Sequence, residues 1–336
     1  MKDILRLLKD GNKPSLLAAI VNTGIAILKA VAYVLTGNVA MFAETLHSLG
    51  DAANQFFVYI GSALSKKAPT PNFPNGFGRV VNLVCLGAVI VVGIMSYEAV
   101  KEGWHHVLNP VETTGLFINL GVLGLATLLE FFVLIKASKE IAHETGQPYS
   151  GLKAFVHSFT HLNKAKPATK LVFMEDMVAT IGGLLAFTAV LIAHFTGFLQ
   201  AEGIASILIG LMMFYVVGKI FLDNARGAIG ETDEEMLNHI ALIIAEDPDI
   251  KDIQKVEVIK EGEYLHVEVI AEVDPKQTVA YIDDVRDRLM KLVLKQKGVR
   301  EALISFDEDD GIKTWQGVNE PTMSDETRKK LPEYKK

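Results

Sequence analysis

The sequence AETLHSLGD occupies positions 43–51 and places acidic and imidazole side chains inside the apolar stretch Val39–Leu64. A helix needs about 20 apolar residues to cross a bilayer, and this stretch is long enough. Ionisable side chains within a membrane span are costly and usually mark a pathway for ions or substrates. We therefore interpret residues 39–64 as a membrane-spanning helix whose polar residues serve the function of the protein.

Five more apolar stretches of similar length come before about residue 223. They are Ser15–Leu35, Val80–Val100, Gly115–Ile135, Lys170–Phe195 and Ala201–Leu222. The chain has 336 residues, of which 50% are hydrophobic, and a mean hydropathy of +0.28, which excludes an ordinary soluble enzyme and a disordered chain. Its single cysteine, Cys85, excludes a disulfide-stabilised secreted domain. We predict an α-helical membrane protein with six transmembrane helices. These helices form a transport domain over residues 1–226.

Positive charge is distributed asymmetrically between the loops. Lys and Arg occur in the N-terminal segment, in the second-to-third loop and in the fourth-to-fifth loop, but not in the opposite loops near 36–38, 108–114 and 196–200. Cytoplasmic loops carry an excess of positive charge. We therefore expect both termini in the cytoplasm. Because the N-terminal segment mixes charged with apolar residues, we expect no signal peptide, and a location in the cell inner (plasma) membrane.

The composition becomes that of a soluble domain after Arg226. Apolar periodicity there predicts the order helix, strand, strand, helix, strand. These elements are Asp233–Ala245, Ile253–Ile259, Leu265–Val273, Val279–Lys297 and Val299–Phe306. We predict a small α+β domain over residues 227–310, with both helices on one face of the sheet. Residues 311–336 are charged and are expected to form a disordered tail.

His47 and Asp51 are four residues apart and share one face of a helix, with Cβ atoms about 6 Å apart. An imidazole nitrogen and a carboxylate oxygen at this separation can bind one divalent metal ion. A hydrogen-bonded His–Asp pair that joins two helices is the alternative. The cost of burying both groups in a membrane favours the metal site.

The fifth apolar stretch contains two adjacent acids, Glu175 and Asp176. Adjacent residues on a helix point about 100° apart. We therefore expect one carboxylate to face His47 and Asp51, while the other bonds a neighbouring helix or carries a proton.

Other ionisable residues within the apolar stretches include Lys29, Glu44, Glu98, Glu130 and Glu202. Lys29 either neutralises Glu44 or extends to the membrane interface. Glu130 and Glu202 lie near the ends of their stretches, where we expect them to be exposed.

These residues resemble the motifs of the cation diffusion facilitator family of divalent-metal/proton antiporters. The matching positions are Asn22, Lys29, 36–38, 43–51, 75–79, 175–176 and 230–232. The resemblance implies six spans, a cytoplasmic ferredoxin-like domain and a homodimer. The Glu175–Asp176 pair is similar to the branch that includes the eukaryotic zinc transporter nine.

The resemblance also implies the metal ligands. His47, Asp51 and Asp176 match the family pattern, and Glu175 is a candidate fourth ligand because Val172 occupies the usual position four residues before Asp176. Tyr281 and Ser305 replace the metal-binding histidines of the C-terminal domain, so we expect this domain to dimerise without binding metal tightly.

The fourth-to-fifth loop contains His143, and it contains His157 and His161 one helical turn apart. Such a pair could collect metal ions from the cytoplasm. An amphipathic helix at the membrane surface is the alternative that we favour.

The sequence therefore predicts efflux of a divalent cation, Zn²⁺, by alternating access and in exchange for protons. Its partners would be the metal ion, protons, the lipid bilayer and a second copy of the chain, with no resident cofactor. The net charge of −7 argues against nucleic acid as a partner. Export of Mn²⁺, Fe²⁺ or Co²⁺ and a non-transporting membrane scaffold remain alternatives, whereas an intramembrane metalloprotease would need an HExxH motif, which is absent.

Overall fold

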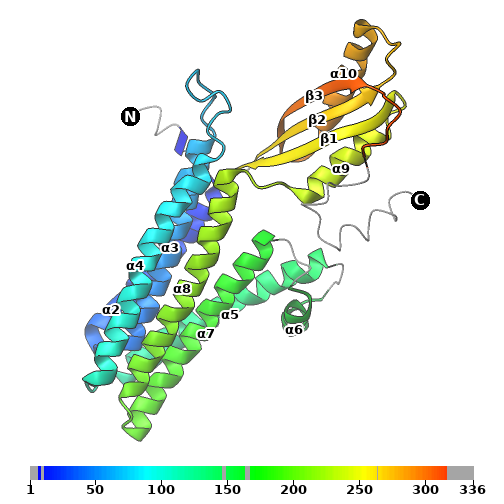
Figure 1. The fold of residues 1–336 in the computed structure, drawn as a ribbon. Coiled ribbons are helices and arrows are strands. Elements are labelled where there is room, and N and C mark those ends of the chain that lie inside the picture. Colours follow the sequence, from blue (N-terminus) through cyan, green and yellow to red (C-terminus); the bar gives the residue numbers. More distant parts are fainter. Residues whose placement is uncertain (1–6, 9–10, 146–148, 163–166, 263, 316–336) are drawn as a thin grey trace. The chain divides into compact units, whose positions relative to one another are not determined.

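The computed structural model describes residues 7–8, 11–145, 149–162, 167–262 and 264–315 (Figure 1). These residues divide into two compact units. The first comprises residues 1–63 and 83–225, and the second comprises residues 64–82 and 226–336. Most of the predicted tail, residues 316–336, lies outside the described part of the chain.

Long helices build the first unit. They are α2 (Lys13–Thr36), α3 (Val39–Ser65), α4 (Val80–Leu108), α5 (Leu116–Glu144), α7 (Pro167–Thr196) and α8 (Gln200–Ile229). All except α3 are long and apolar enough to cross a membrane. The polar residues of α3 lower its hydropathy, and they are the ones that we expect to be functional. The prediction of a helical membrane protein with a small α+β domain is confirmed, and the six long helices agree with the six predicted spans.

A tight turn joins α2 to α3. Gly37 ends α2 in the left-handed conformation, at φ 69°, and its N–H donates to the carbonyl of Tyr33 at 2.7 Å. The side chain of Asn38 then accepts a hydrogen bond from the N–H of Met41 at 2.8 Å. Glycine and asparagine favour these two conformations, so the sequence itself sets the connection between the two helices.

Small residues bring α4 and α8 unusually close together. A Cβ atom on Gly203 would lie 2.7 Å from the carbonyl oxygen of Gly103, and one on Gly210 would lie 2.9 Å from that of Ser96. The hydroxyl of Ser206 donates to the carbonyl of Ala99 at 2.8 Å. Close backbone approach through small residues is the usual basis of helix association in membranes.

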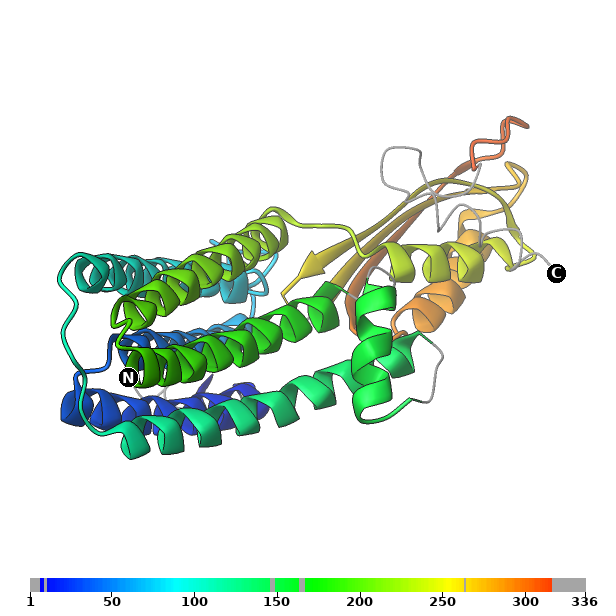
Figure 2. The same ribbon diagram turned by 90° about the horizontal axis from the view of Figure 1, so that it is seen from below.

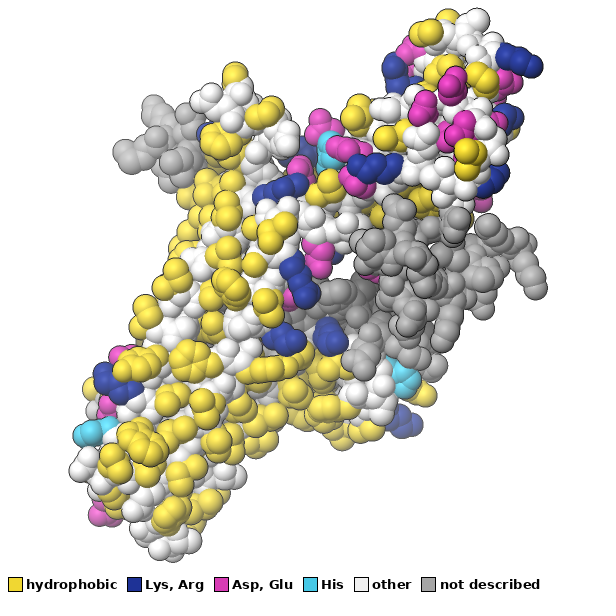
Figure 3. All heavy atoms as spheres, in the orientation of Figure 1, with side chains coloured by type: hydrophobic (Ala, Val, Ile, Leu, Met, Phe, Trp, Pro, Cys, Tyr) yellow, Lys and Arg dark blue, Asp and Glu magenta, His cyan; other side chains and the backbone are white. Residues whose placement is uncertain are grey.

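The other helices pack through larger side chains. Helix α5 runs beside α7 and also contacts α2 (Figure 2). Buried residues of α2, α3, α4, α5, α7 and α8 form one apolar core. Hydrophobic side chains also cover much of the helical surface in the view of Figure 3, as expected for helices that face lipid.

The second unit contains a three-stranded sheet and two helices. Its elements are α9 (Glu234–Ala245), β1 (Ile250–Glu261), β2 (Tyr264–Val273), α10 (Val279–Val293) and β3 (Val299–Glu308). The strand order is β1-β2-β3, with β1 antiparallel and β3 parallel to β2. Apolar residues from both helices and all three strands share one core. The predicted element order and hairpin are confirmed, although α10 ends at Val293 rather than at Lys297.

Residues that follow β3 contact the first strand of the sheet. The carboxylate of Asp252 accepts hydrogen bonds from the backbone N–H groups of Thr314 and Trp315. Trp315 also packs against the core of this unit. The described start of the predicted tail, up to residue 315, is therefore bound to β1.

Candidate metal site

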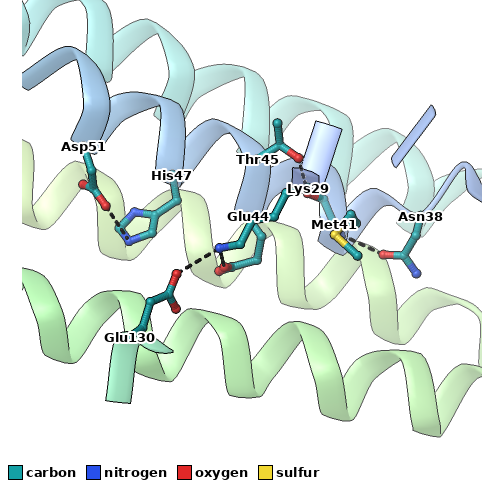
Figure 4. Close-up of polar contacts among 8 residues, drawn as sticks. All are labelled: Lys29, Asn38, Met41, Glu44, Thr45, His47, Asp51 and Glu130. Atoms are coloured by element: carbon teal, nitrogen blue, oxygen red, sulfur yellow. Dashed lines mark hydrogen bonds and ion pairs between the residues drawn. The ribbon is translucent and has the colours of Figure 1, made fainter. Parts of the chain in front are cut away.

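Helix α3 presents three ionisable side chains along one face (Figure 4). Glu44, His47 and Asp51 are separated by three and four residues, which brings them onto the same side of a helix. The His47 Nε2 atom lies 3.5 Å from the Asp51 Oδ2 atom. The His47 side chain is only 6% exposed, whereas the Asp51 side chain is 42% exposed. The predicted pair therefore forms, with the imidazole inside the helical unit and the carboxylate at its accessible edge.

The imidazole of His47 is available to a ligand. Its Nε2 atom is buried and has no hydrogen-bond partner among the described residues, since the approach of Asp51 is an ion-pair distance without hydrogen-bond geometry. A buried polar atom without a partner is costly. Coordination of a metal ion would satisfy this nitrogen.

Helix α7 brings both predicted acids toward this pair. The carboxylate of Asp176 lies near enough to interact electrostatically with Asp51 and with His47. Its Oδ2 atom is buried and, like His47 Nε2, has no hydrogen-bond partner among the described residues. Glu175 interacts electrostatically with both Asp51 and Asp176. Adjacent positions on α7 thus both reach the acidic region around Asp51.

The four predicted residues do not close on a single point. Within the described residues, no three His, Cys, Asp or Glu side chains stand close enough together to hold a metal ion. Val172 lies one turn before Asp176, is largely exposed and supplies no donor atom. Ionised carboxylates repel one another, and either a bound cation or a proton relieves that repulsion.

A second polar cluster lies one turn along α3 from His47 (Figure 4). The Lys29 ammonium of α2 lies 2.7 Å from Glu44 Oε2 and 2.9 Å from Glu130 Oε1 of α5. The expected pairing of Lys29 with Glu44 is confirmed. The expectation that Glu130 is exposed is wrong, because α5 extends well beyond the apolar stretch and places Glu130 in its middle.

Glu202 at the start of α8 is also buried. It is 1% exposed, and its Oε1 atom accepts a hydrogen bond from the Thr113 hydroxyl at 2.9 Å. The expectation of exposure is wrong here too, because the segment before α5 covers this helix end. The position of Glu202 near the end of an apolar stretch did not indicate that the loop before α5 covers it.

The sequence did not reveal one acidic residue of this region, Asp223, nor the interactions of another, Glu130. Asp223, just beyond the sixth apolar stretch, interacts electrostatically with Glu175. Glu130 interacts electrostatically with His47 and with Glu44. Their positions along the helices could have indicated these interactions. That inference requires the helix ends as the structure has them.

The loop histidines lie apart from this region. Helix α6 (Leu152–His161) is amphipathic, with exposed apolar side chains at Leu152, Val156 and Phe159. The rings of His157 and His161 stack with centroids 3.9 Å apart. Partial desolvation and the neighbouring His161 lower the pKa of His157. The apolar face supports the interpretation as a surface helix.

Residues 15–227 match the family model of the cation efflux transmembrane domain. The chain therefore belongs to the cation efflux family, whose members are membrane transporters and not enzymes. This confirms the resemblance to cation diffusion facilitators and agrees with the prediction that the protein is not an enzyme.

Several characterised proteins are similar to this chain. The mouse protein named proton-coupled zinc antiporter SLC30A9, mitochondrial, is 24% identical over 260 residues, which are 76% of this chain and 44% of that protein. The zinc transporter ZitB of Escherichia coli strain K12 is 26% identical over 301 residues, 84% of each chain. A probable cation efflux system protein of Mycobacterium tuberculosis is 24% identical over 260 residues, 76% of this chain and 70% of the relative. The chain spans less than half the length of the SLC30A9 antiporters that it matches.

Proposed function

We propose that this protein exports a divalent metal cation, Zn²⁺, across a membrane in exchange for protons. One observation carries the proposal. Two buried atoms of metal-ligand type, His47 Nε2 and Asp176 Oδ2, lack hydrogen-bond partners among the described residues, and both belong to groups that interact with Asp51. Glu175 is the candidate fourth ligand. The names of two relatives, a zinc antiporter and a zinc transporter, support this proposal.

Exchange with protons follows from the chemistry of these ligands. A divalent ion binds neutral imidazole and ionised carboxylates, whereas protonation of the same groups releases it. Alternating exposure of the site to the two sides of the membrane would then move metal one way and protons the other.

The donor set discriminates poorly among divalent ions, so the names of the relatives carry the choice of Zn²⁺. One imidazole with carboxylates suits Zn²⁺, Mn²⁺, Fe²⁺ and Co²⁺, and the lack of thiolate ligands disfavours Cu⁺. We propose that the transported ion is the only metal involved and that no resident cofactor is needed.

The orientation and assembly belong to the same proposal. Positive charge in the N-terminal segment and in the loops near residues 66–79 and 136–166 supports termini on the cytoplasmic side of the cell inner membrane. The C-terminal unit would hold two copies of the chain together.

Zinc flux into proteoliposomes that contain the full-length protein tests this function. We expect Zn²⁺ movement that is driven by a pH gradient, and a loss of at least tenfold in Asp51→Asn and Asp176→Asn, because each removes an ionised ligand. Glu98→Gln is the matched control, since Glu98 pairs with Lys101 on α4 and belongs to neither polar cluster. Wild-type flux in Asp51→Asn and Asp176→Asn would refute the ligand assignment, and no flux in the wild type would favour a scaffold.

Competition in the same assay tests the identity of the ion. We expect excess Zn²⁺ to suppress uptake of Mn²⁺ or Co²⁺ more strongly than the reverse. The opposite order would identify the protein as an exporter of the competing metal.

A further inference from the structure

One buried ammonium group forms ion pairs with two carboxylates from different helices. Lys29 of α2 lies between Glu44 of α3 and Glu130 of α5, at 2.7 Å and 2.9 Å from their nearest oxygens. The side chains of Lys29 and Glu44 are fully buried, and that of Glu130 is 14% exposed. We refer to Lys29, Glu44 and Glu130 as the ion triad (Figure 4).

The ion triad is unbalanced in charge when both acids are ionised. One ammonium then faces two carboxylates, which leaves a net negative charge inside a membrane domain, where an uncompensated charge is costly. Glu44 Oε1 and Glu130 Oε2 are buried and have no hydrogen-bond partner among the described residues. A proton on one of the two carboxyl groups makes the triad neutral.

Geometry favours Glu130 as the group that takes this proton. Glu44 has the shorter contact with Lys29 and is completely enclosed, so we assign it as the counter-ion of Lys29. Glu130 has the longer contact and the only partly exposed side chain of the three.

The charge at Glu130 also depends on the metal site. The groups that interact with it are Lys29 from α2, Glu44 and His47 from α3, and Asp176 from α7. A divalent ion held by His47 and Asp176 would repel a proton on Glu130. Binding of metal and binding of this proton are therefore mutually unfavourable.

We propose that Glu130 is a proton-carrying residue of the exchange, distinct from the metal ligands. Its carboxylate oxygen binds one proton from water when the metal leaves, and it returns that proton to water when the next metal ion binds. This inference rests on the proposed function, because it assigns one of the exchanged protons to a residue that does not coordinate the metal.

The number of protons exchanged per metal ion tests the proposal. The full-length protein is reconstituted in proteoliposomes with the membrane potential held at zero, and the Zn²⁺ gradient that stops net flux is measured at several imposed pH gradients. Each exchanged proton changes this balancing gradient about tenfold per pH unit. Glu130→Gln keeps a hydrogen-bond acceptor for Lys29 but cannot carry the proton. We therefore expect the change in the balancing Zn²⁺ gradient per pH unit to be about tenfold smaller than in the wild type. Zn²⁺ binding should persist.

Each result separates the two proposals. Glu98→Gln should behave as the wild type. A Glu130→Gln protein that binds Zn²⁺ and shows the full wild-type shift would overturn the role of Glu130 and leave the antiport intact, whereas a wild type without any shift would refute the antiport itself. Should Glu130→Gln fail to fold, Glu44→Gln gives the same test, because Lys29 then keeps Glu130 permanently ionised. An unchanged shift in Glu44→Gln would also overturn the proposal.

Discussion

Gly182 of α7 faces the carboxylate of Glu44, and its missing side chain leaves the space that the ion triad occupies. A Cβ atom at this position would lie 2.7 Å from Glu44 Oε1. The Glu44 side chain is held by Lys29 and is fully enclosed, so it has no free space into which to move. This glycine is a steric requirement of the triad.

We expect Gly182→Ala to destabilise the protein by about 1–3 kcal/mol, the usual cost of overpacking a well-packed interior. The control is Gly218→Ala in α8, where nothing lies within 4 Å of the added Cβ. That control should be neutral or stabilising by up to about 1 kcal/mol. Thermal unfolding in detergent measures both, and equal stability of the two variants would contradict this account of Gly182.

The sequence revealed some of these residues but not their partners. The spacing of His47 and Asp51 predicted their pairing, because four residues make one helical turn. Glu130 was placed wrongly, because apolar composition ends near residue 135 while α5 continues to Glu144. The convergence of Lys29 and Glu130 joins residues 101 positions apart, which local periodicity does not encode.

An ion cluster joins elements of the C-terminal unit, with Asp247 buried and Arg288 partly exposed. Arg288 of α10 donates hydrogen bonds to Asp247 and to Asp249, which follow α9. The hydroxyl of Tyr281 donates to Asp249 at 2.7 Å. These bonds from Arg288 and Tyr281 hold the pKa of Asp249 below its ordinary value of 3.8. The cluster therefore attaches α10 to the turn between α9 and β1.

This lowered pKa gives a pH dependence with a definite sign. A carboxyl group whose pKa is lower in the folded state stabilises that state above its ordinary pKa, and the contribution disappears as the pH falls through the lowered value. We expect protection of α10 from hydrogen exchange in the full-length protein to decrease below about pH 4.

Asp249→Asn should weaken this pH dependence, whereas Asp284→Asn, on the exposed surface of the same helix, should leave it unchanged. Hydrogen exchange read by mass spectrometry distinguishes the two. An identical acid response in wild type and Asp249→Asn would exclude this cluster as its origin.

At the scale of the whole molecule, single cysteines report the orientation of the chain in the membrane. Cys85 is buried and can be replaced by alanine to give a cysteine-free background. Glu112→Cys, in the loop before α5, and Lys153→Cys, in α6 after it, then place single thiols at exposed positions.

We expect a membrane-impermeant maleimide to label Glu112→Cys in intact cells and Lys153→Cys only after lysis. This follows from the charge asymmetry of the loops, since cytoplasmic loops retain the excess of Lys and Arg. The reverse labelling pattern would contradict the proposed orientation.

Composition and periodicity predicted the architecture well at this scale. Long apolar stretches gave the spans, and alternation gave the hairpin between β1 and β2. The candidate site was predictable only in part. Its ligand types and the His47–Asp51 pair follow from one helix, whereas the approach of Asp176 and the position of Glu130 depend on how separate helices pack.

The glycine contacts between α4 and α8 constrain any motion of this domain. With Gly103 against Gly203 and Ser96 against Gly210, the two backbones approach so closely that even a methyl group at either α8 glycine would clash, which disfavours movement of one helix past the other. We therefore expect α4 and α8 to move together as one unit. A change that opens the domain to either aqueous compartment would then displace this pair relative to α2, α3, α5 and α7.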